Sequence, residues 1–247
     1  MCRLFAYLGP PMSLDRLLLT SERSFMRQAW EPRHQRHGVV NVDGFGVGWY
    51  DFEVRPEPAR YRRAIPIWAD RNFFAFSGLV RTTAALASLR AASTFLPVEE
   101  SSTAPFTSGP WLFAHNGEVD GFRSGTAARM RRRLSDQRLT EIEGTSDSEL
   151  LFAMVLDQLD VGAEPGDALA EVVKVVDGLG GGRLNMLLTD GHRLAGVVAG
   201  DTMFLRQGED GVRLASEPAD DSLEWEPVPD RTVVSGDVAG LRQGPLA

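Results

Sequence analysis

The sequence predicts an α+β fold, because its strand-like segments come in runs and its helix-like segments are grouped apart from them. The clearest strand pattern is a hairpin in residues 183–200, and the clearest helix pattern covers residues 146–160. The chain has 247 residues, 43% of them hydrophobic, so it can bury a sizeable core. It contains no repeat and no low-complexity linker, and we predict one domain over residues 1–247.

Four segments define the first part of this fold. "CRLFAYLG" (2–9) alternates between faces and predicts a strand, and "SLDRLLLT" (13–20) predicts a helix capped by Ser13. "GFGVGWYDF" (44–52) combines glycine with aromatic residues, which favours a strand that other backbone approaches closely. "TTAALASLRAAST" (82–94) stays ambiguous, since its alanines favour a helix while its place before a proline-rich loop suits a buried strand.

The second part continues with strands and helices. "WLFAHNG" predicts a strand ending in a turn, and residues 121–135 and 164–177 predict helices on either side of 146–160. Ser146 and Glu149 have the spacing of a capping box at the start of that central helix. Asp190-Gly191 marks the turn of the hairpin. We expect further strands near the segments 202–206, 211–216 and 231–235, with a loop before the last.

Composition narrows the class of protein. The net charge of −8 argues against a general nucleic-acid binder, and no apolar run approaches the roughly 20 residues that span a bilayer. One cysteine permits no intrachain disulfide, and "LFAYLGPPM" is too short and proline-rich for a signal-peptide core, so we expect a cytoplasmic protein without a membrane partner. The four histidines lack metal-ligand spacing, and "DGLGGGR" lacks the P-loop lysine, so we predict neither metal nor cofactor. A homo-oligomer stays open.

The only cysteine, Cys2, occupies a position where chains usually fray. If Met1 is removed, Cys2 carries a thiol and a free α-amine roughly 3 Å apart, with ordinary pKa values of about 8.5 and 7.7–8.0. A near-neutral base beside a soft nucleophile is the pairing that covalent acyl transfer requires. An inert cysteine, or one that serves as a small buried hydrophobe, is the alternative.

Five motifs occur in a fixed order along the chain: "CRLF", "HGVVNVDGFGVGWY", "LRAAST", "AHNGEVD" and "TSDSELLF". Together they resemble the class II glutamine amidotransferase family, whose domains belong to the N-terminal-nucleophile hydrolase superfamily. The resemblance covers most of the chain. It implies a single type-2 amidotransferase domain, folded as a four-layer αββα sandwich of two antiparallel sheets between helices, with Cys2 as the nucleophile.

The resemblance also implies roles for particular residues. Asn116 and Gly117 match the pair that stabilises the oxyanion, and Arg90 and Asp147 match the groups that hold the α-carboxylate and α-ammonium of the substrate. The remaining implied substrate contacts are Ser93, Thr94, His115 and Trp225. Taken one by one, these residues have simpler interpretations: an Asn-Gly turn, a solvated or ion-paired arginine, and an acidic residue favoured by a helix dipole.

A further group of matching residues lies in segment 37–48, together with Arg3. In the family this segment packs around the nucleophile. The matching residues here are Arg3, His37, Asn41, Asp43, Gly44, Gly46 and Gly48. We interpret His37 as a structural hydrogen-bonding residue, with a role as a second acid or base as the alternative. "GFGVG" lacks the G-x-G-x-x-G spacing of a dinucleotide loop.

Three segments, "PIWADRNF", "GGRLN" and "LASEPADDSLEWEPVPDR", look most like the stand-alone hydrolases of ergothioneine biosynthesis within this family. Those enzymes remove the γ-glutamyl group from γ-glutamyl-hercynylcysteine sulfoxide, a small molecule whose leaving group carries a trimethylammonium. Quaternary ammonium groups prefer aromatic faces and carboxylates. The candidates for this contact are Trp49, Tyr50, Trp68, Trp225, Asp220 and Asp221.

Three rival functions stay open. The chain could be a glutaminase subunit that hands ammonia to a separate synthetase, but Ala91 stands where ammonia-transferring members usually carry tryptophan. It could be a γ-glutamyl dipeptide hydrolase. It could also be a non-catalytic binding module on the same fold, against which Cys2 and Asn116 both argue.

Overall fold

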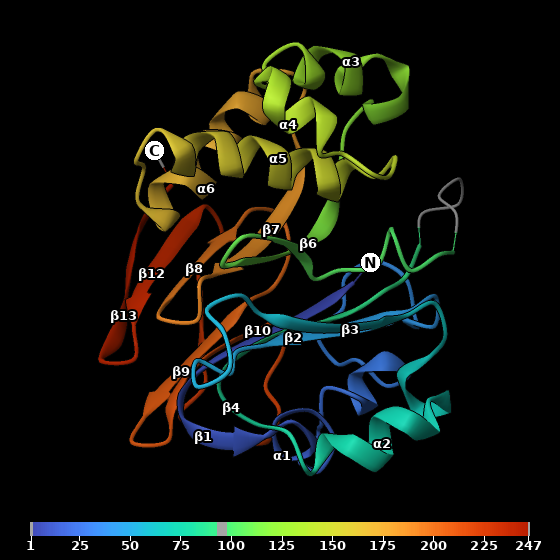
Figure 1. Cartoon of the computed structure of the whole chain (residues 1–247), viewed down its shortest axis with the longest axis vertical. Helices are drawn as coiled ribbons and strands as arrows, with labels where there is room; N and C mark the ends of the chain where they lie inside the picture. Colours follow the sequence, from blue (N-terminus) through green and yellow to red (C-terminus); the bar gives the residue numbers. More distant parts are fainter. Residues whose placement is uncertain (1, 93–97, 247) are drawn as a thin grey trace.

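Two antiparallel β-sheets pack face to face between layers of helices (Figure 1). This computed structural model describes residues 2–92 and 98–246. Together the sheets and helices form the four-layer αββα sandwich that the resemblance implied. In the described ranges, no helix has both the length and the apolar character needed to cross a membrane.

The first sheet contains the N-terminal strand at its centre. Its strands run in the order β11 (Glu226–Pro227), β9 (Phe204–Gly208), β10 (Gly211–Ala215), β1 (Arg3–Ser13), β4 (Arg81–Leu89), β2 (Phe45–Trp49) and β3 (Ala59–Arg63). β1 pairs with β10 on one side and with β4 on the other. The start of the chain is therefore anchored on both sides by backbone hydrogen bonds.

The second sheet contains the predicted hairpin. Its order is β13 (Gly240–Pro245), β12 (Thr232–Asp237), β8 (Arg193–Val198), β7 (Gly182–Thr189), β6 (Trp111–Val119) and β5 (Phe106–Ser108). β7 and β8 pair antiparallel around the Asp190-Gly191 turn, which confirms the sequence prediction. β6 pairs with β7 from Leu112 to Val119, so residues 116 and 117 face residues 185 and 184.

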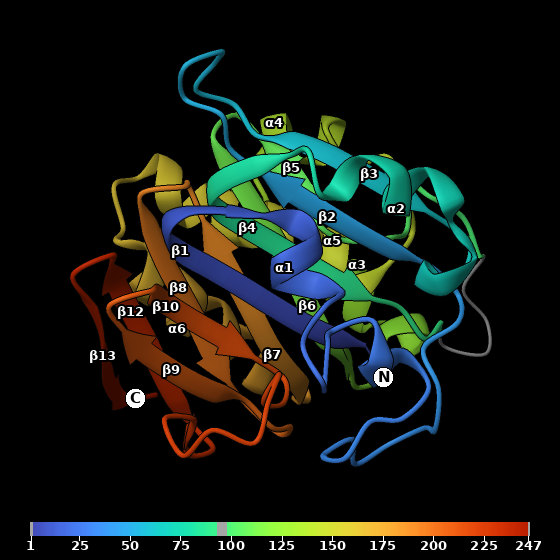
Figure 2. The same cartoon turned by 90° about the horizontal axis from the view of Figure 1, so that it is seen from below.

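Helices cover the outer face of each sheet. α5 (Asp147–Asp160) and α6 (Pro165–Asp177) pack on the second sheet, with α3 (Thr126–Arg131) and α4 (Asp136–Thr140) beside α5. α1 (Leu14–Leu18) and α2 (Arg71–Ser77) lie over the first sheet (Figure 2). Short 3₁₀ turns occupy Arg27–Ala29, Ile67–Ala69 and Phe122–Ser124.

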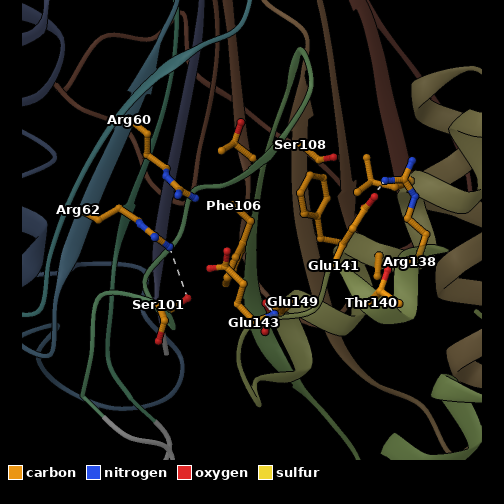
Figure 3. A pocket seen from close by; sticks show the side chains of 14 residues that line it. Arg60, Arg62, Ser101, Phe106, Ser108, Arg138, Thr140, Glu141, Glu143 and Glu149 are labelled. Carbon is orange, nitrogen blue, oxygen red and sulfur yellow. Dashed lines mark hydrogen bonds and ion pairs between the residues drawn. The ribbon is translucent and has the colours of Figure 1, made fainter. Parts of the chain in front are cut away.

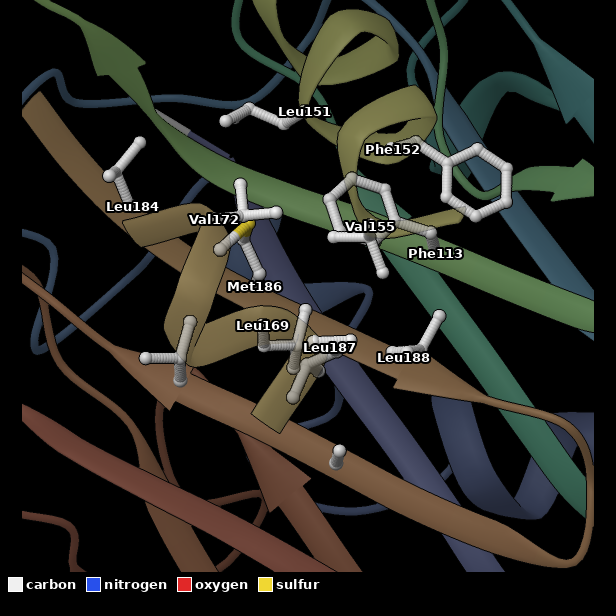
Figure 4. Close-up of a cluster of buried hydrophobic side chains, with 14 of the residues drawn as sticks. Phe113, Leu151, Phe152, Val155, Leu169, Val172, Leu184, Met186, Leu187 and Leu188 are labelled. Atoms are coloured by element: carbon white, nitrogen blue, oxygen red, sulfur yellow. The ribbon is translucent and has the colours of Figure 1, made fainter. Parts of the chain in front are cut away.

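The alternation of β1 produces two cores. Leu4, Ala6 and Leu8 face the second sheet and belong to the large central cluster, whereas Phe5 and Tyr7 face α1 and α2. Burial on both faces explains why β1 is apolar at nearly every position. Figure 4 shows the outer part of the large cluster, where side chains of α5 and α6 pack on β6 and β7.

The structure resolves or corrects several sequence predictions. In the ambiguous segment 82–94, residues 82–89 belong to strand β4 (Arg81–Leu89), with small alanines packed between the layers. The predicted helix 121–135 is broken into a 3₁₀ turn and α3. Ser13 precedes α1, but its hydroxyl caps no backbone amide. The close approach predicted for "GFGVG" is present, since a Cβ on Gly46 would lie 2.3 Å from the Ala104 carbonyl oxygen.

Candidate active site

Cys2 directly precedes β1, and hydrogen bonds hold the residues next to it. Arg3 donates from Nε to the Cys2 carbonyl oxygen at 2.9 Å. Leu4 and Ser216 exchange two hydrogen bonds of 2.9 Å, which tie the start of β1 to the segment after β10. Cys2 itself is half-buried. These hydrogen bonds fix the backbone on the C-terminal side of Cys2.

One small pocket collects most of the predicted site residues. Cys2, Arg90, His115, Gly117 and Asp147 all line it. The rest of its wall is formed by small or apolar side chains: Ser88, Ala91, Ala92, Ser102, Ala104, Phe106, Ser146 and Ser148. These residues come from the position before β1, from β4 and the residues after it, from β5 and the segment before it, from β6, and from the start of α5. Ser93 and Thr94 lie outside the described residues.

The predicted oxyanion pair lies within a strand and not at its end. β6 continues to Val119, so the prediction of a turn at Asn116-Gly117 was wrong. Gly117 has a φ of +155°, and a Cβ there would lie 1.7 Å from the carbonyl oxygen of Arg183. Only glycine fits this close approach of β7. Asn116, beside it, is completely buried.

Arg90 follows directly after β4 and is 5% exposed. Its backbone amide donates to the Gly44 carbonyl oxygen at 2.8 Å, and its own carbonyl oxygen accepts from the Asp43 amide at 3.0 Å. The Asp43 carboxylate also accepts from the Ala92 amide at 2.8 Å. Residues 43 and 44 therefore set the position of Arg90 in the pocket wall.

Asp147 occupies the first turn of α5, after the N-cap residue Ser146. The Ser146 hydroxyl accepts from the Glu149 amide, as predicted, but the Glu149 carboxylate accepts from the Glu143 and Gly144 amides at 2.7 Å and does not complete the capping box. Asp147 accepts from the Val119 amide at 3.0 Å, which joins α5 to β6. The carboxylate is thus fixed at the pocket.

His115 lines the pocket, but both of its ring nitrogens have protein partners. Nε2 lies 3.0 Å from the Arg183 carbonyl oxygen, and Nδ1 lies 2.9 Å from the Ser148 hydroxyl. A carbonyl oxygen can only accept, so Nε2 carries a proton and donates to Arg183, whereas the Ser148 hydroxyl can either donate to Nδ1 or accept from it. The two contacts hold the imidazole ring in the pocket wall.

Trp225 does not reach this pocket. It is buried, its indole nitrogen donates to Asp220 at 3.0 Å, and it lines a different pocket with Leu17 and Arg206. The expectation that Trp225 contacts the substrate is therefore corrected. Among the other aromatic candidates, Tyr50 is buried, whereas Trp68 is 39% exposed beside Trp30, with ring centroids 5.2 Å apart.

A larger cavity of about 380 Å³ adjoins the pocket that Cys2 lines, and Phe106 lines both. Arg60 and Arg62 project into it from β3, opposite Glu143 and the Arg138–Glu141 pair of α4 (Figure 3). Arg62 also donates to the carbonyl oxygens of Ser101 and Thr103. Desolvation, reinforced by the charge of Arg62, lowers the pKa of Arg60 to about 10. No sequence pattern indicated this cavity, because arginines on a short edge strand are equally typical of a solvated face.

Comparison with known proteins places this geometry in a family. The family model described as "Glutamine amidotransferases class-II" matches residues 1–208. The chain therefore belongs to the class II glutamine amidotransferases. Among curated members, the γ-glutamyl-hercynylcysteine sulfoxide hydrolase of Mycobacterium tuberculosis is 38% identical over 95% of this chain and 92% of its own length. The protein of the same name from Mycolicibacterium smegmatis is 36% identical, over 95% of each chain.

Solved structures of class II amidotransferases share this fold. A glutamine aminotransferase class-II domain protein from Silicibacter pomeroyi superposes with a TM-score of 0.74 and 26% identity over the full length of both chains. The glutamine phosphoribosylpyrophosphate amidotransferase of Bacillus subtilis has a TM-score of 0.72 at 14% identity. This chain covers 49% of that enzyme, so the likeness concerns the amidotransferase fold alone.

Proposed function

We propose that this amidotransferase-family protein is an amidohydrolase that splits γ-glutamyl-hercynylcysteine sulfoxide into glutamate and hercynylcysteine sulfoxide. The observation that carries the proposal is the convergence of Cys2, Gly117, Arg90 and Asp147 on one pocket. Relatives that bear this activity in their names are 36–38% identical over 95% of the chain, which supports the choice of substrate. We expect the protein to act in the cytoplasm.

The reaction begins once Met1 has been removed. The α-amine of Cys2 takes the thiol proton, directly or through a water, and the thiolate attacks the γ-carbonyl carbon. The Gly117 amide and the Asn116 side chain donate to the oxyanion that forms. As the C–N bond breaks, the α-ammonium returns the proton to the leaving amine, and a γ-glutamyl thioester remains on the sulfur.

Water then completes the cycle. The free α-amine removes a proton from the attacking water, the thioester C–S bond breaks, and the proton passes to the sulfur as glutamate leaves. Arg90 pairs with the α-carboxylate of the glutamyl group and Asp147 with its α-ammonium, which holds the γ-carbonyl over the sulfur. Two opposite charges at fixed positions select a glutamyl group whose α-carboxylate and α-ammonium are both unsubstituted.

The leaving group requires a place for its trimethylammonium. Trp68 and Trp30 form an exposed edge-to-face pair. The carbonyl oxygen of Ala29, next to Trp30, accepts from the Asn41 amide at 2.7 Å. Asn41 lies two residues before Asp43, whose carboxylate accepts from the amide of Ala92 in the pocket wall. We assign the quaternary ammonium to this aromatic pair, because indole faces attract such cations.

The test compares glutamate release from γ-glutamyl-hercynylcysteine sulfoxide, glutamine and γ-glutamyl dipeptides, with Cys2→Ala as the inactive control. The expected kcat/KM is highest for the sulfoxide. A higher kcat/KM for glutamine would support the glutaminase alternative, and a higher value for dipeptides the peptidase alternative. Mass spectrometry of the wild-type protein should show an N-terminus that begins at Cys2.

A further inference from the structure

A buried ionic cluster lies behind the nucleophile. The guanidinium of Arg3 lies 3.5 Å from the Asp201 carboxylate and 3.8 Å from the Glu217 carboxylate, and all three side chains are at most 3% exposed. Burial lowers the pKa of Arg3 and raises the pKa of Glu217. Removing three charges from water is costly, and an apolar cluster of the same volume is often at least as stable. Stability alone gives no reason for charges here.

Asp201 connects this cluster to the oxyanion residue Asn116. The Asn116 amide nitrogen donates to the Asp201 carboxylate at 2.8 Å. The carboxylate is itself held in place, because its second oxygen accepts from the Thr202 amide at 2.8 Å and the Asp201 amide donates to the Asn185 side chain at 3.2 Å. Asp201 lies in the connection between β8 and β9, whereas Asn116 lies in β6, so the contact joins segments that are distant in sequence.

This contact determines the orientation of the Asn116 amide. A carboxylate accepts but does not donate, so the nitrogen of the amide, and not its oxygen, must face Asp201. One N–H is then used by Asp201 and the other is left for a different acceptor. The buried Oδ1 of Asn116 has no hydrogen-bond partner within the described residues. Without the charge of Asp201, the amide could turn over and present its oxygen to the oxyanion.

We propose that Asp201 is a positioning residue for the oxyanion hole, with Arg3 as its counter-charge. Asp201 holds the Asn116 amide so that the second N–H meets the oxyanion, and Arg3 joins this assembly to the nucleophile by its hydrogen bond to the Cys2 carbonyl oxygen. The inference rests on the proposed γ-glutamyl amide hydrolysis. Because the oxyanion exists only after attack, the contribution of Asp201 appears in kcat and not in KM.

The decisive variant is Asp201→Asn, which keeps the shape and removes the charge. We expect kcat to fall about 10- to 100-fold with KM changed less than about twofold. The matched control is Asp190→Asn. Asp190 is also buried and pairs with an arginine, Arg193 at 2.8 Å, but lies at the other end of β7. Its kcat and KM should stay within about twofold of wild type.

Two inhibitors separate positioning from a general structural role. Glutamate γ-semialdehyde forms a tetrahedral adduct as its aldehyde carbon bonds to the Cys2 sulfur, and the adduct oxygen occupies the oxyanion hole. Glutamate binds through its α-groups without an adduct. Asp201→Asn should weaken semialdehyde inhibition by about the factor lost in kcat. It should leave the inhibition constant of glutamate within about twofold of wild type.

Equal weakening of both inhibitors, or an unchanged kcat, would overturn the assignment. If Asp201→Asn does not fold, Arg3→Lys replaces it, since lysine keeps the charge but lacks the fork that reaches Asp201 and Cys2 together; the same split between inhibitors is expected. Failure of the proposed function looks different. Wild-type enzyme would then hydrolyse glutamine or dipeptides in preference to the sulfoxide, while the inhibitor ratio would still test Asp201.

Discussion

The backbone of Asp43 holds the backbone of Arg90, with an N···O distance of 3.0 Å between the Asp43 amide and the Arg90 carbonyl oxygen. Arg90 in return donates to Gly44 at 2.8 Å. These bonds extend the pairing of β2 and β4 by one step beyond their regular ends. The guanidinium is thereby attached to a rigid sheet, which is the placement that a carboxylate-binding residue needs.

Arg90→Lys should raise KM for γ-glutamyl substrates by about 10- to 100-fold, because lysine keeps the charge but cannot make a bidentate pair with the α-carboxylate. Steady-state kinetics on glutamine and on the sulfoxide measure the effect. The control is Arg81→Lys, at the other end of β4, where the exposed side chain donates to the Pro11 carbonyl oxygen. A KM for Arg90→Lys equal to that of the control would remove Arg90 from the binding site.

Gly117→Ala should reduce kcat by about 100-fold or more, since the new Cβ forces the oxyanion-donating backbone away from Arg183. Gly162→Ala provides the comparison. The φ of Gly162 is +88°, but no atom lies within 4 Å of the added Cβ. The Gly162→Ala variant therefore measures the effect of conformational strain without a steric clash. Circular dichroism and kinetics on both proteins distinguish the effects. Comparable activity in the two variants would contradict the close-approach argument.

Glu217→Gln should change how stability depends on pH. Burial raises the pKa of Glu217, against the opposing effects of the His34 amide and the Arg3 charge. The native state therefore binds this proton more tightly than the unfolded state, and the resulting stabilisation is complete below about pH 4, near the unfolded pKa. It is lost as the pH rises through the folded pKa.

Urea unfolding of wild type and Glu217→Gln between pH 4 and pH 7.5 measures this contribution. The unfolding free energy of wild type minus that of the variant should decrease as the pH rises. Asp210→Asn should show the reverse slope when the series is extended below pH 4, because burial, which raises the pKa of Asp210, is outweighed by the combined hydrogen bond and charge of Arg213 and the charge of Arg206. A difference for Glu217 that is independent of pH would show that its proton affinity is the same in both states.

Trp68→Ala should raise KM for the sulfoxide substrate by about 2- to 30-fold, the equivalent of a cation–π contact of about 0.5–2 kcal/mol. The rise should be much smaller for glutamine, which lacks the quaternary ammonium. Trp225→Ala serves as the aromatic control, because Trp225 lines a pocket apart from Cys2. Equal changes in KM for both substrates would exclude Trp68 from recognition of the leaving group.

The local sequence pattern was enough to predict those helices and strands whose own residues show alternation, capping or turn chemistry. The strand predicted over residues 2–9 is present within β1 (Arg3–Ser13), and the helix capped by Ser146 and the hairpin at Asp190-Gly191 are confirmed, because alternation, capping and turn chemistry act over a few residues. The strands β3, β5, β11 and β13 were not predicted. β3 reads "ARYRR", and its arginines are arranged by the cavity they line rather than by a buried face.

The order of the motifs was enough to predict Cys2 as the nucleophile and Arg90, Gly117 and Asp147 as its neighbours, and all four line one pocket. The charged residues behind this pocket could be found only in the folded chain. Asp201 contacts Asn116 across 85 positions, and Glu217, two residues after the end of β10, lies beside Arg3 at the start of β1. Such contacts have no local pattern, because charges become neighbours in a protein interior only after distant strands have paired.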